Sequence, residues 1–182
     1  MSTTKWLLDP THSELGFKIK HLMISNVSGT FKNFTAEVET EEEDFRTAQI
    51  ILTAEMTSVT TNNEQRDAHL RNSDFFEVEN YPELKFKSTK VEKIDDDTFT
   101  LYGELTLKDV TNPVKLDVEF NGVIKDPWGG ERAGFVITGK ISRSKWGVNF
   151  NAALETGGVV LGDEVKIVSD IQLVKQAIAV IA

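Results

Sequence analysis

Apolar and polar residues alternate along most of this chain, so that every second side chain is hydrophobic over at least seven segments. Leu15, Phe17 and Ile19 alternate with polar or small neighbours, and the same pattern recurs from Phe99 to Leu107. Because successive side chains of a β-strand point to opposite faces, this period of two predicts strands with one apolar face. The other apolar rows run over Phe34–Val38, Ala48–Met56, Val114–Phe120, Ala133–Ile141 and Val165–Leu173, and Leu84–Ser88 begins one more.

The segments between these expected strands are short and rich in turn-forming residues. Asp95–Asp97 and Asp126–Gly130 fit hairpin loops, and Asp109–Pro113 is expected to be a further break. Short loops leave no room for helical crossovers, so the strands are antiparallel. Long antiparallel strands without covering helices close into a barrel or stack as a sandwich, and strand-interior glycines such as Gly103 favour the barrel. We therefore expect one all-β domain over residues 1–182, an extended antiparallel barrel of eight strands.

One segment departs from the alternation. Residues 62–73 are polar and helix-compatible, with Thr61 or Asn62 as the expected N-cap. This predicts a short helix, which runs directly into Phe75 and Phe76. A charged helix joined to an aromatic pair is suited to the mouth of an apolar cavity.

Composition excludes several classes of function. The formal net charge is −9 and no basic stripe offsets the acids, which argues against nucleic acid or an anionic membrane face as a partner. The chain has no cysteine, so it has no disulfide and no thiolate site. No apolar run approaches the roughly 20 residues of a spanning helix, and the first residues do not form a signal peptide. We expect a soluble, cytoplasmic protein.

The usual signatures of catalysis and of metal binding are missing. None of the three histidines, His12, His21 and His69, lies four residues from another, and His12 and His21 are expected to hydrogen-bond locally at strand ends. No Gly-x-Ser-x-Gly motif is present. We expect no metal, no cofactor and no catalytic residue. An enzyme on isoprenoid or quinone substrates, using Asp67 and His69, is the least favoured reading.

The interior of an eight-stranded barrel either fills with side chains or holds one elongated ligand, and the strand pattern leaves both open. In a ligand tunnel, Arg66, His69 and Arg71 would meet a polar head group at the entrance, because the forked donors of arginine suit carboxylate or phosphate oxygens. The expected wall residues are Phe17, Ile19, Phe75, Phe76, Phe86, Leu105, Leu107, Phe120, Phe135 and Ile137. The alternative is a filled barrel that serves as an interaction module and forms a homodimer through the apolar tail Ile178–Ile181.

The chain resembles the YceI-like family of polyisoprenoid-binding, lipocalin-like proteins. The matching blocks follow one another in order, and they include Trp6-Leu-Leu-Asp9-Pro10-Thr-His12-Ser13, Arg66-Asp67-Ala-His69-Leu70-Arg71-Asn-Ser-Asp74-Phe75-Phe76, Tyr81-Pro82-Glu-Leu-Lys-Phe86, Asp126-Pro127-Trp128-Gly129, Ser142-Arg143 and Trp146-Gly147-Val148.

This resemblance implies an extended lipocalin-like barrel around a long hydrophobic pore. Its ligand would be an isoprenoid or another long-chain amphiphile, and its role the binding, carriage or storage of such lipids, with links to transport and stress response. The resemblance also implies that Trp6, Asp9 and His12 close the barrel and that Asp67 braces Arg66 or Arg71.

Overall fold

The computed structural model describes residues 2–152 and 160–176. The tail Ile178–Ile181, on which the expected dimer depends, lies outside these residues. The described residues form β1 (Thr3–Leu8), η1 (Pro10–His12), β2 (Glu14–His21), β3 (Ser25–Phe31), β4 (Phe34–Glu41), β5 (Asp44–Glu55), η2 (Met56–Ser58), β6 (Val59–Thr60), α1 (Glu64–Arg71), β7 (Glu83–Lys93), β8 (Thr98–Leu107), β9 (Val110–Lys125), β10 (Glu131–Ser142), η3 (Arg143–Trp146) and β11 (Leu161–Lys175), where η marks a 3-10 helix.

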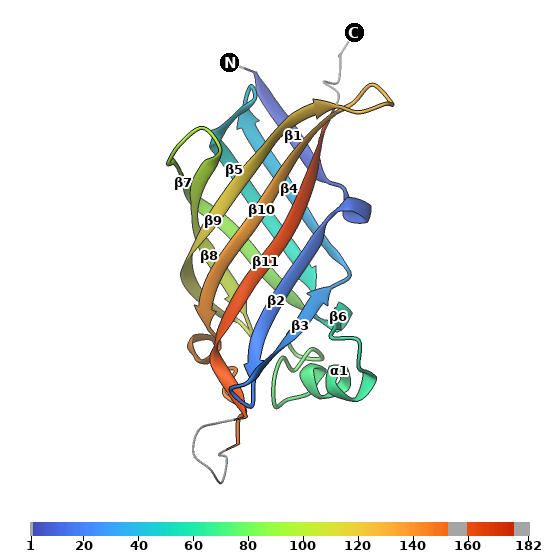
Figure 1. Ribbon diagram of the computed structural model, residues 1–182, viewed down its shortest axis with the longest axis vertical. Helices are drawn as coiled ribbons and strands as arrows, with labels where there is room; N and C mark the ends of the chain where they lie inside the picture. The colour runs from blue at the N-terminus through green and yellow to red at the C-terminus, as the bar shows by residue number, and fades with distance from the viewer. Residues whose placement is uncertain (1, 153–159, 177–182) are drawn as a thin grey trace.

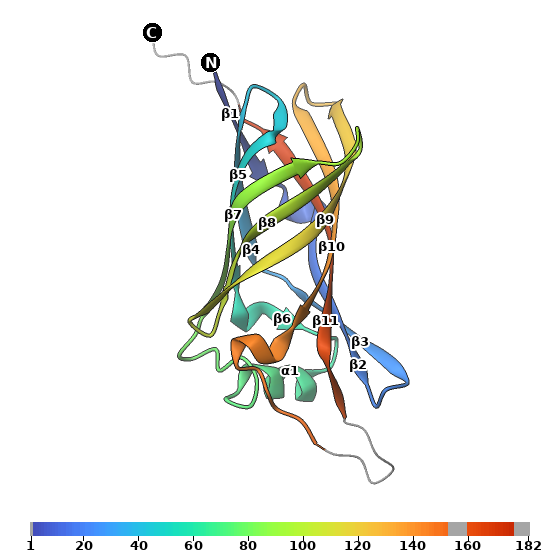
Figure 2. The ribbon, with the colours of Figure 1, turned by 90° about the vertical axis from the view of Figure 1, so that its left-hand side faces the viewer.

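Eight strands close into an antiparallel barrel, as the alternation predicted. Neighbouring strands follow the order β1-β4-β5-β7-β8-β9-β10-β11, and β11 pairs back onto β1 (Figures 1 and 2). Trp6 lies opposite Lys175 in this last pairing, and Leu8 lies opposite Leu173. Because the ring is closed, each of its eight strands is paired on both sides over at least part of its length.

Two consecutive strands share one position in the ring. The C-terminal half of β11 pairs with β1, while its N-terminal half pairs with β2, where Ile167 lies opposite Phe17. The short helix η1 separates β1 from β2 and begins with Pro10, with Asp9 as its N-cap. After this break β2 pairs with β3, and β3 pairs in turn with the two-residue strand β6. These three strands extend the barrel wall at the end where α1 lies (Figure 1).

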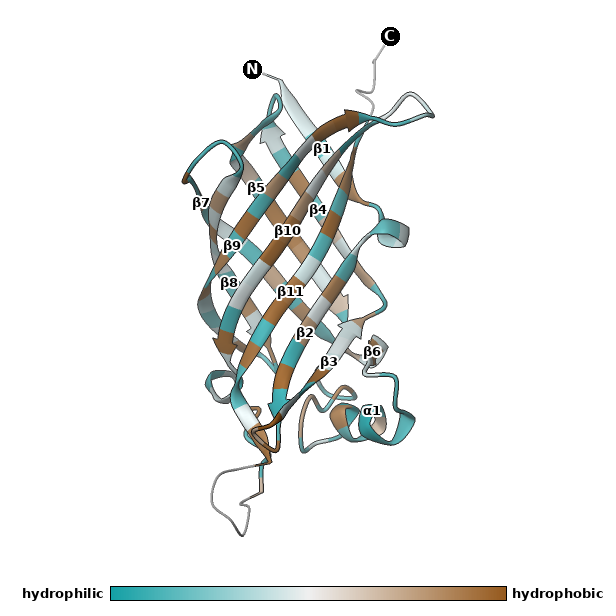
Figure 3. Ribbon diagram, in the orientation of Figure 1, coloured by the Kyte–Doolittle hydropathy of each residue, from teal (hydrophilic) through white to brown (hydrophobic). Residues whose placement is uncertain are grey.

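The apolar rows of the sequence face the barrel interior. Apolar and polar residues alternate along β10 and β11 in Figure 3, and the buried core includes Phe135, Ile171 and Leu173 from these strands. The rows predicted for the other long strands also contribute to this core. β1, β3 and β6 were not predicted, because β3 is largely polar and β6 has only two residues.

Two local expectations were wrong. The helix begins later than predicted: Asn63 is the N-cap, and its Oδ1 accepts a hydrogen bond from the Arg66 backbone N–H at 3.0 Å. The predicted break at Asp109–Pro113 is also misplaced, because the turn consists of Lys108 and Asp109 alone, with φ of 53° and 58°. Positive φ at both central residues is the geometry of a tight two-residue hairpin, so β9 begins at once, at Val110.

Gly103 leaves room for an aromatic ring. A Cβ atom at this position would lie 2.4 Å from the ring of Phe86 on the neighbouring strand β7, a distance that no side chain tolerates. The phenyl ring therefore lies directly against the backbone of β8. Phe17 covers Gly29 in the same way across β2 and β3, where a Cβ would lie 2.3 Å from the ring.

Candidate ligand cavity

The barrel is not filled. A cavity of about 450 Å³ runs inside it, and its lining consists mainly of the inward apolar side chains of the strands. Helix α1 and η3 lie at one end of the barrel, at the bottom of Figures 1 and 2, and we call this end the mouth because lining residues reach the surface there. Arg66 and Phe150 line the cavity there and also reach the surface. A volume of this size lies within the range of roughly 300–1,000 Å³ that is usual for small-molecule sites.

Most of the residues expected at a ligand site lie on this cavity. Arg66 and His69 line it at the mouth, while Arg71 and Phe120 are not part of the lining. The expected wall residues that do line it are Phe17, Ile19, Phe75, Phe76, Phe86, Leu105, Leu107, Phe135 and Ile137.

An aromatic cluster fills the end of the barrel opposite the mouth, which we call the closed end. Phe45 lies at its centre, with ring centroids 5.1 Å from Trp6, 5.3 Å from Phe120 and 5.0 Å from Phe135. Phe120 and Phe135 stack on each other at 5.2 Å. Phe120 thus belongs to the packing behind the cavity, whereas Phe45 and Phe135 form its inner end.

Hydrogen bonds fix helix α1 at the mouth. The carboxylate of Asp67 accepts from the Thr61 backbone N–H at 2.7 Å, from Thr61 Oγ1 at 2.6 Å and from Thr60 Oγ1 at 3.1 Å. Burial alone would raise the pKa of Asp67, but these hydrogen bonds outweigh it and hold the pKa below its ordinary value. Arg66 donates to Thr61 as well, from Nε to Oγ1 at 2.6 Å. Asp67 therefore anchors α1 to the end of β6 and does not hydrogen-bond Arg66 or Arg71, contrary to expectation.

His69 belongs to a cluster of three rings that joins α1 to the chain after η3. Its ring centroid lies 4.9 Å from both Phe75 and Phe150, which are 5.1 Å apart. Its Nε2 hydrogen-bonds Asp74 Oδ2 at 2.8 Å. Because Asp67 is engaged with β6, the structure does not bring Asp67 and His69 together as a catalytic pair.

Arg143 also lines the cavity, although it is not among the residues expected there from the sequence. It continues the inward row of Ile137, Gly139 and Ile141, and it is only 6% exposed. Its Nε donates to Gly162 O at 2.9 Å and its Nη1 to Val148 O at 2.8 Å. Burial lowers the pKa of Arg143. The signal for this residue was present in the sequence as the next odd-numbered position of an apolar row.

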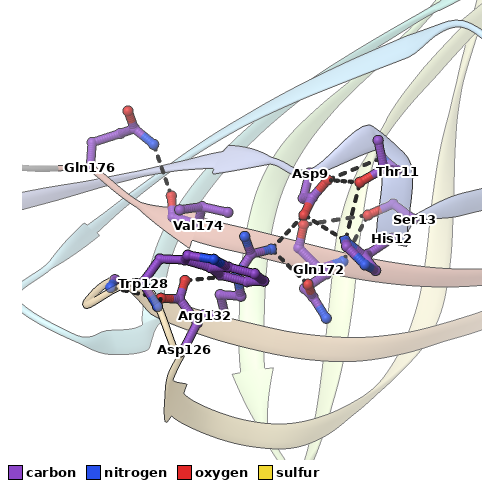
Figure 4. Close-up of polar contacts among 11 residues, drawn as sticks. Asp9, Thr11, His12, Ser13, Asp126, Trp128, Arg132, Gln172, Val174 and Gln176 are labelled. Atoms are coloured by element: carbon purple, nitrogen blue, oxygen red, sulfur yellow. Dashed lines mark hydrogen bonds and ion pairs between the residues drawn. The ribbon is translucent and has the colours of Figure 1, made fainter.

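A second polar cluster lies on the outside of the barrel, where β10 and β11 meet the break between β1 and β2 (Figure 4). Arg132 forms ion pairs with Asp9 and, at 2.9 Å, with Asp126, and the ring of Trp128 covers its guanidinium at 5.8 Å. Asp9 also pairs with His12 Nδ1 at 2.8 Å. The expected local hydrogen bond of His12 is thus confirmed, and this cluster ties the closing seam of the barrel together.

The described residues also bear on metal binding and on membrane crossing. Among residues 2–152 and 160–176, no three histidine or carboxylate side chains gather as a metal site would require. Of the helices in these two ranges, none has the length and apolar character needed to cross a membrane.

Comparison with known proteins identifies the family. The YceI-like domain matches residues 6–173. A UPF0312 protein of Staphylococcus epidermidis is 43% identical over 164 residues, which cover 90% of this chain and 93% of the relative. The crystal structure of a YceI protein of Campylobacter jejuni has 35% identity and a TM-score of 0.76, over 93% of this chain and 96% of that one.

A third likeness shows the fold alone. A polyisoprenoid-binding domain from Saccharophagus degradans superimposes with a TM-score of 0.62 at 15% identity, over 94% of this chain and 98% of that one. The extent of the domain match and the identity to the staphylococcal relative establish that the chain belongs to the YceI-like family.

Proposed function

We propose that this YceI-like protein binds one long apolar chain, that of an isoprenoid or related amphiphilic lipid, inside its barrel and carries or stores it. The observation that supports this most directly is the cavity of about 450 Å³, lined almost throughout by apolar side chains and closed at one end by aromatic rings. The polyisoprenoid-binding domain that shares the fold supports an isoprenoid as the chain.

The length of the cavity can be worked out along β10. The stretch from Phe135, at the closed end, to Arg143, at the mouth, rises by about 26 Å at 3.3 Å per residue. With strands tilted by roughly 40°, this corresponds to about 20 Å along the barrel axis. A fully extended polypeptide spans about 3.6 Å per residue, or about 1.2 Å for each of its three backbone bonds. If an extended carbon chain advances by the same amount per bond, the cavity has room for about 16 carbons in line.

Burial of such a chain supplies the affinity. At about 0.8 kcal/mol per methylene, 16 carbons contribute of the order of 13 kcal/mol before the cost of immobilisation is subtracted. Because this term has no direction, the wall selects the length and width of the chain and leaves the choice of head group to the mouth.

Two substitutions on one strand test the proposal. Ile137 lines the cavity, and the next residue, Thr138, is exposed on the outer face of β10. Ile137→Arg places a charge inside the barrel, and Thr138→Arg places the same charge outside. We expect organic extracts of natively purified wild type and Thr138→Arg to contain a long-chain lipid by mass spectrometry, and folded Ile137→Arg to contain far less.

Uptake of an added prenyl alcohol completes this experiment. Wild type and Thr138→Arg should take it up at one molecule per barrel, and Ile137→Arg should not, with circular dichroism confirming that each variant is folded. Clean extracts from the wild type, together with no uptake of any prenyl or fatty chain, would show that the proposed function is wrong.

A further inference from the structure

The charges that line the cavity have one sign. The chain contains 29 Asp and Glu residues against 20 Lys and Arg, yet no carboxylate belongs to the described lining. The arginines in it are Arg66 and Arg143, and the histidines are His21 and His69. Among the described residues, the fully charged side chains of the lining are therefore the two arginines, although the protein as a whole is acidic.

Arg143 differs from Arg66 in its burial. Arg66 is exposed, whereas Arg143 lies almost completely inside the wall. A buried guanidinium is normally paired with a carboxylate, since desolvation of an unpaired charge is costly. None of the ion pairs among residues 2–152 and 160–176 includes Arg143. Asp163 acts on Arg143 through its charge, and its Oδ1 accepts a hydrogen bond from the Ser144 backbone N–H at 3.1 Å.

The guanidinium is held in place by backbone groups. Its Nε donates to the carbonyl oxygen of Gly162 and its Nη1 to that of Val148, and these two carbonyls belong to different segments at the mouth. Trp146 fixes η3 in turn, because its Nε1 donates to Leu105 O at 2.9 Å across the barrel and its side chain is 1% exposed. Among the described residues, the hydrogen bonds of the Arg143 side chain are these two, and neither uses Nη2. The guanidinium is therefore held by backbone carbonyls on a side chain that also lines the cavity.

We propose that the ligand carries an acidic head group, a carboxylate or a phosphate, and that its oxygens bind Arg143 just inside the mouth. This inference rests on the proposed binding of an apolar chain in the same cavity and adds the chemical class of its polar end. Arginine donors match carboxylate and phosphate oxygens, and a hydrogen bond between charged groups in a dry site is stronger than one between neutral groups. The chain then extends from Arg143 toward the aromatic closed end.

The experiment compares ligands with identical chains and different head groups. Dissociation constants are measured by tryptophan fluorescence or calorimetry for palmitic acid against hexadecanol, and for geranylgeranyl phosphate against geranylgeraniol. In the wild type we expect the acidic member of at least one pair to bind about 10- to 100-fold more tightly. The pair with the larger ratio tells whether the head group is a carboxylate or a phosphate.

Variants assign this preference to Arg143. In Arg143→Gln the ratio should fall to nearly one, whereas Lys145→Gln, which removes an exposed charge from the same 3-10 helix, should keep the wild-type ratio. If Arg143→Gln does not fold, Arg143→Lys retains the charge but not the fork, and it should lower the ratio several-fold.

Three results would overturn the inference. They are equal affinity of both members of each pair for the wild type, an undiminished ratio in folded Arg143→Gln or Arg143→Lys, and a ratio that collapses in Arg66→Gln but not in the Arg143 variants. In each case the neutral chain still binds, so the proposed function stands. Failure of every chain to bind would instead contradict the proposed function itself.

Discussion

A tryptophan placed about three quarters of the way from the mouth to the closed end should shorten the chain that the protein accepts. Ile137 lies on the inward face of β10 between the mouth and the closed end. An eight-stranded barrel is only wide enough inside for side chains or one slim ligand, so a single indole blocks its cross-section. Thr138→Trp is the matched control, because Thr138 is exposed on the outer face of the same strand.

The expected change follows from the geometry of β10. From Arg143 to Ile137 the strand rises by about 20 Å, or about 15 Å along the barrel axis, which is room for about 12 carbons. By the same reasoning the proposed chain would bury about 16 carbons in the wild type, so Ile137→Trp should remove about four methylenes from it. At about 0.8 kcal/mol each, this loss is about 3 kcal/mol, or roughly 200-fold in affinity for a 16-carbon chain.

The assay is a chain-length profile. Dissociation constants for saturated acids of increasing length should fall by about fourfold per added carbon until the chain meets the aromatic closed end, and then level off. We expect the plateau near 16 carbons for the wild type and Thr138→Trp, and near 12 for Ile137→Trp. Identical profiles for all three proteins would refute the placement of the chain along β10. A thermal melt of each variant checks that the indole has not unfolded the barrel.

The polar cluster at the seam yields two further predictions. Arg132→Met leaves the carboxylates of Asp9 and Asp126 without their cation in a partly buried site. It should lower the free energy of unfolding by about 2 kcal/mol and the melting temperature by about 4–8 °C. An unchanged melting temperature would show that the cluster does not stabilise the closed barrel. The pKa values of Asp9, Asp67 and Asp126 are all lowered. Burial raises the pKa of Asp9 and of Asp67, but the hydrogen bonds that each carboxylate accepts, including those from His12 and Arg132 to Asp9, outweigh burial. At Asp126 the hydrogen bond from the Gly130 backbone contributes most to the lowered pKa. A carboxylate with a lowered pKa stabilises the fold at pH values above its unfolded pKa near 4, and this stabilisation is lost as the pH falls through its folded pKa. The urea midpoint of unfolding should therefore be constant from about pH 7 to 5 and fall steadily below about pH 4. Equal midpoints at about pH 7 and pH 3 would contradict this prediction.

The wall of the barrel was predictable because it depends on a local rule. Once a row such as Ile137, Gly139 and Ile141 alternates with polar residues, its direction is fixed in any sheet that has one buried face. Phe120 shows the limit of that rule. Its row faces inward as expected, but whether a ring lines the space or fills it depends on Phe45 and Phe135, which come from distant strands.

The role of Arg143 in the lining and the first residue of the helix were not predicted from the sequence, for different reasons. Arg143 occupies the next inward position of an apolar row, but an arginine at the end of such a row carries no local sign that it is buried, and the neighbouring Trp146 bonds to Leu105 on a distant strand. At the helix, several adjacent residues are good N-caps, and the backbone decides among them: Asn62 has φ of 62°, so the helical turn cannot begin until Asn63.

The pairing of β1 with β11 also determines when the protein can have a cavity at all. Joining Trp6 to Lys175 closes a loop of roughly 170 residues, which costs about 2.5 kcal/mol more in chain entropy than a hairpin of about 10. The hairpins from β7 to β10 should therefore form early, and the seam should close late. During synthesis, β11 leaves the ribosome after every other described strand, so until then the nascent strands should form at most an open sheet with its apolar face uncovered. A lipid that reaches this sheet before closure would be wrapped by the folding chain and would not have to thread past α1 afterwards.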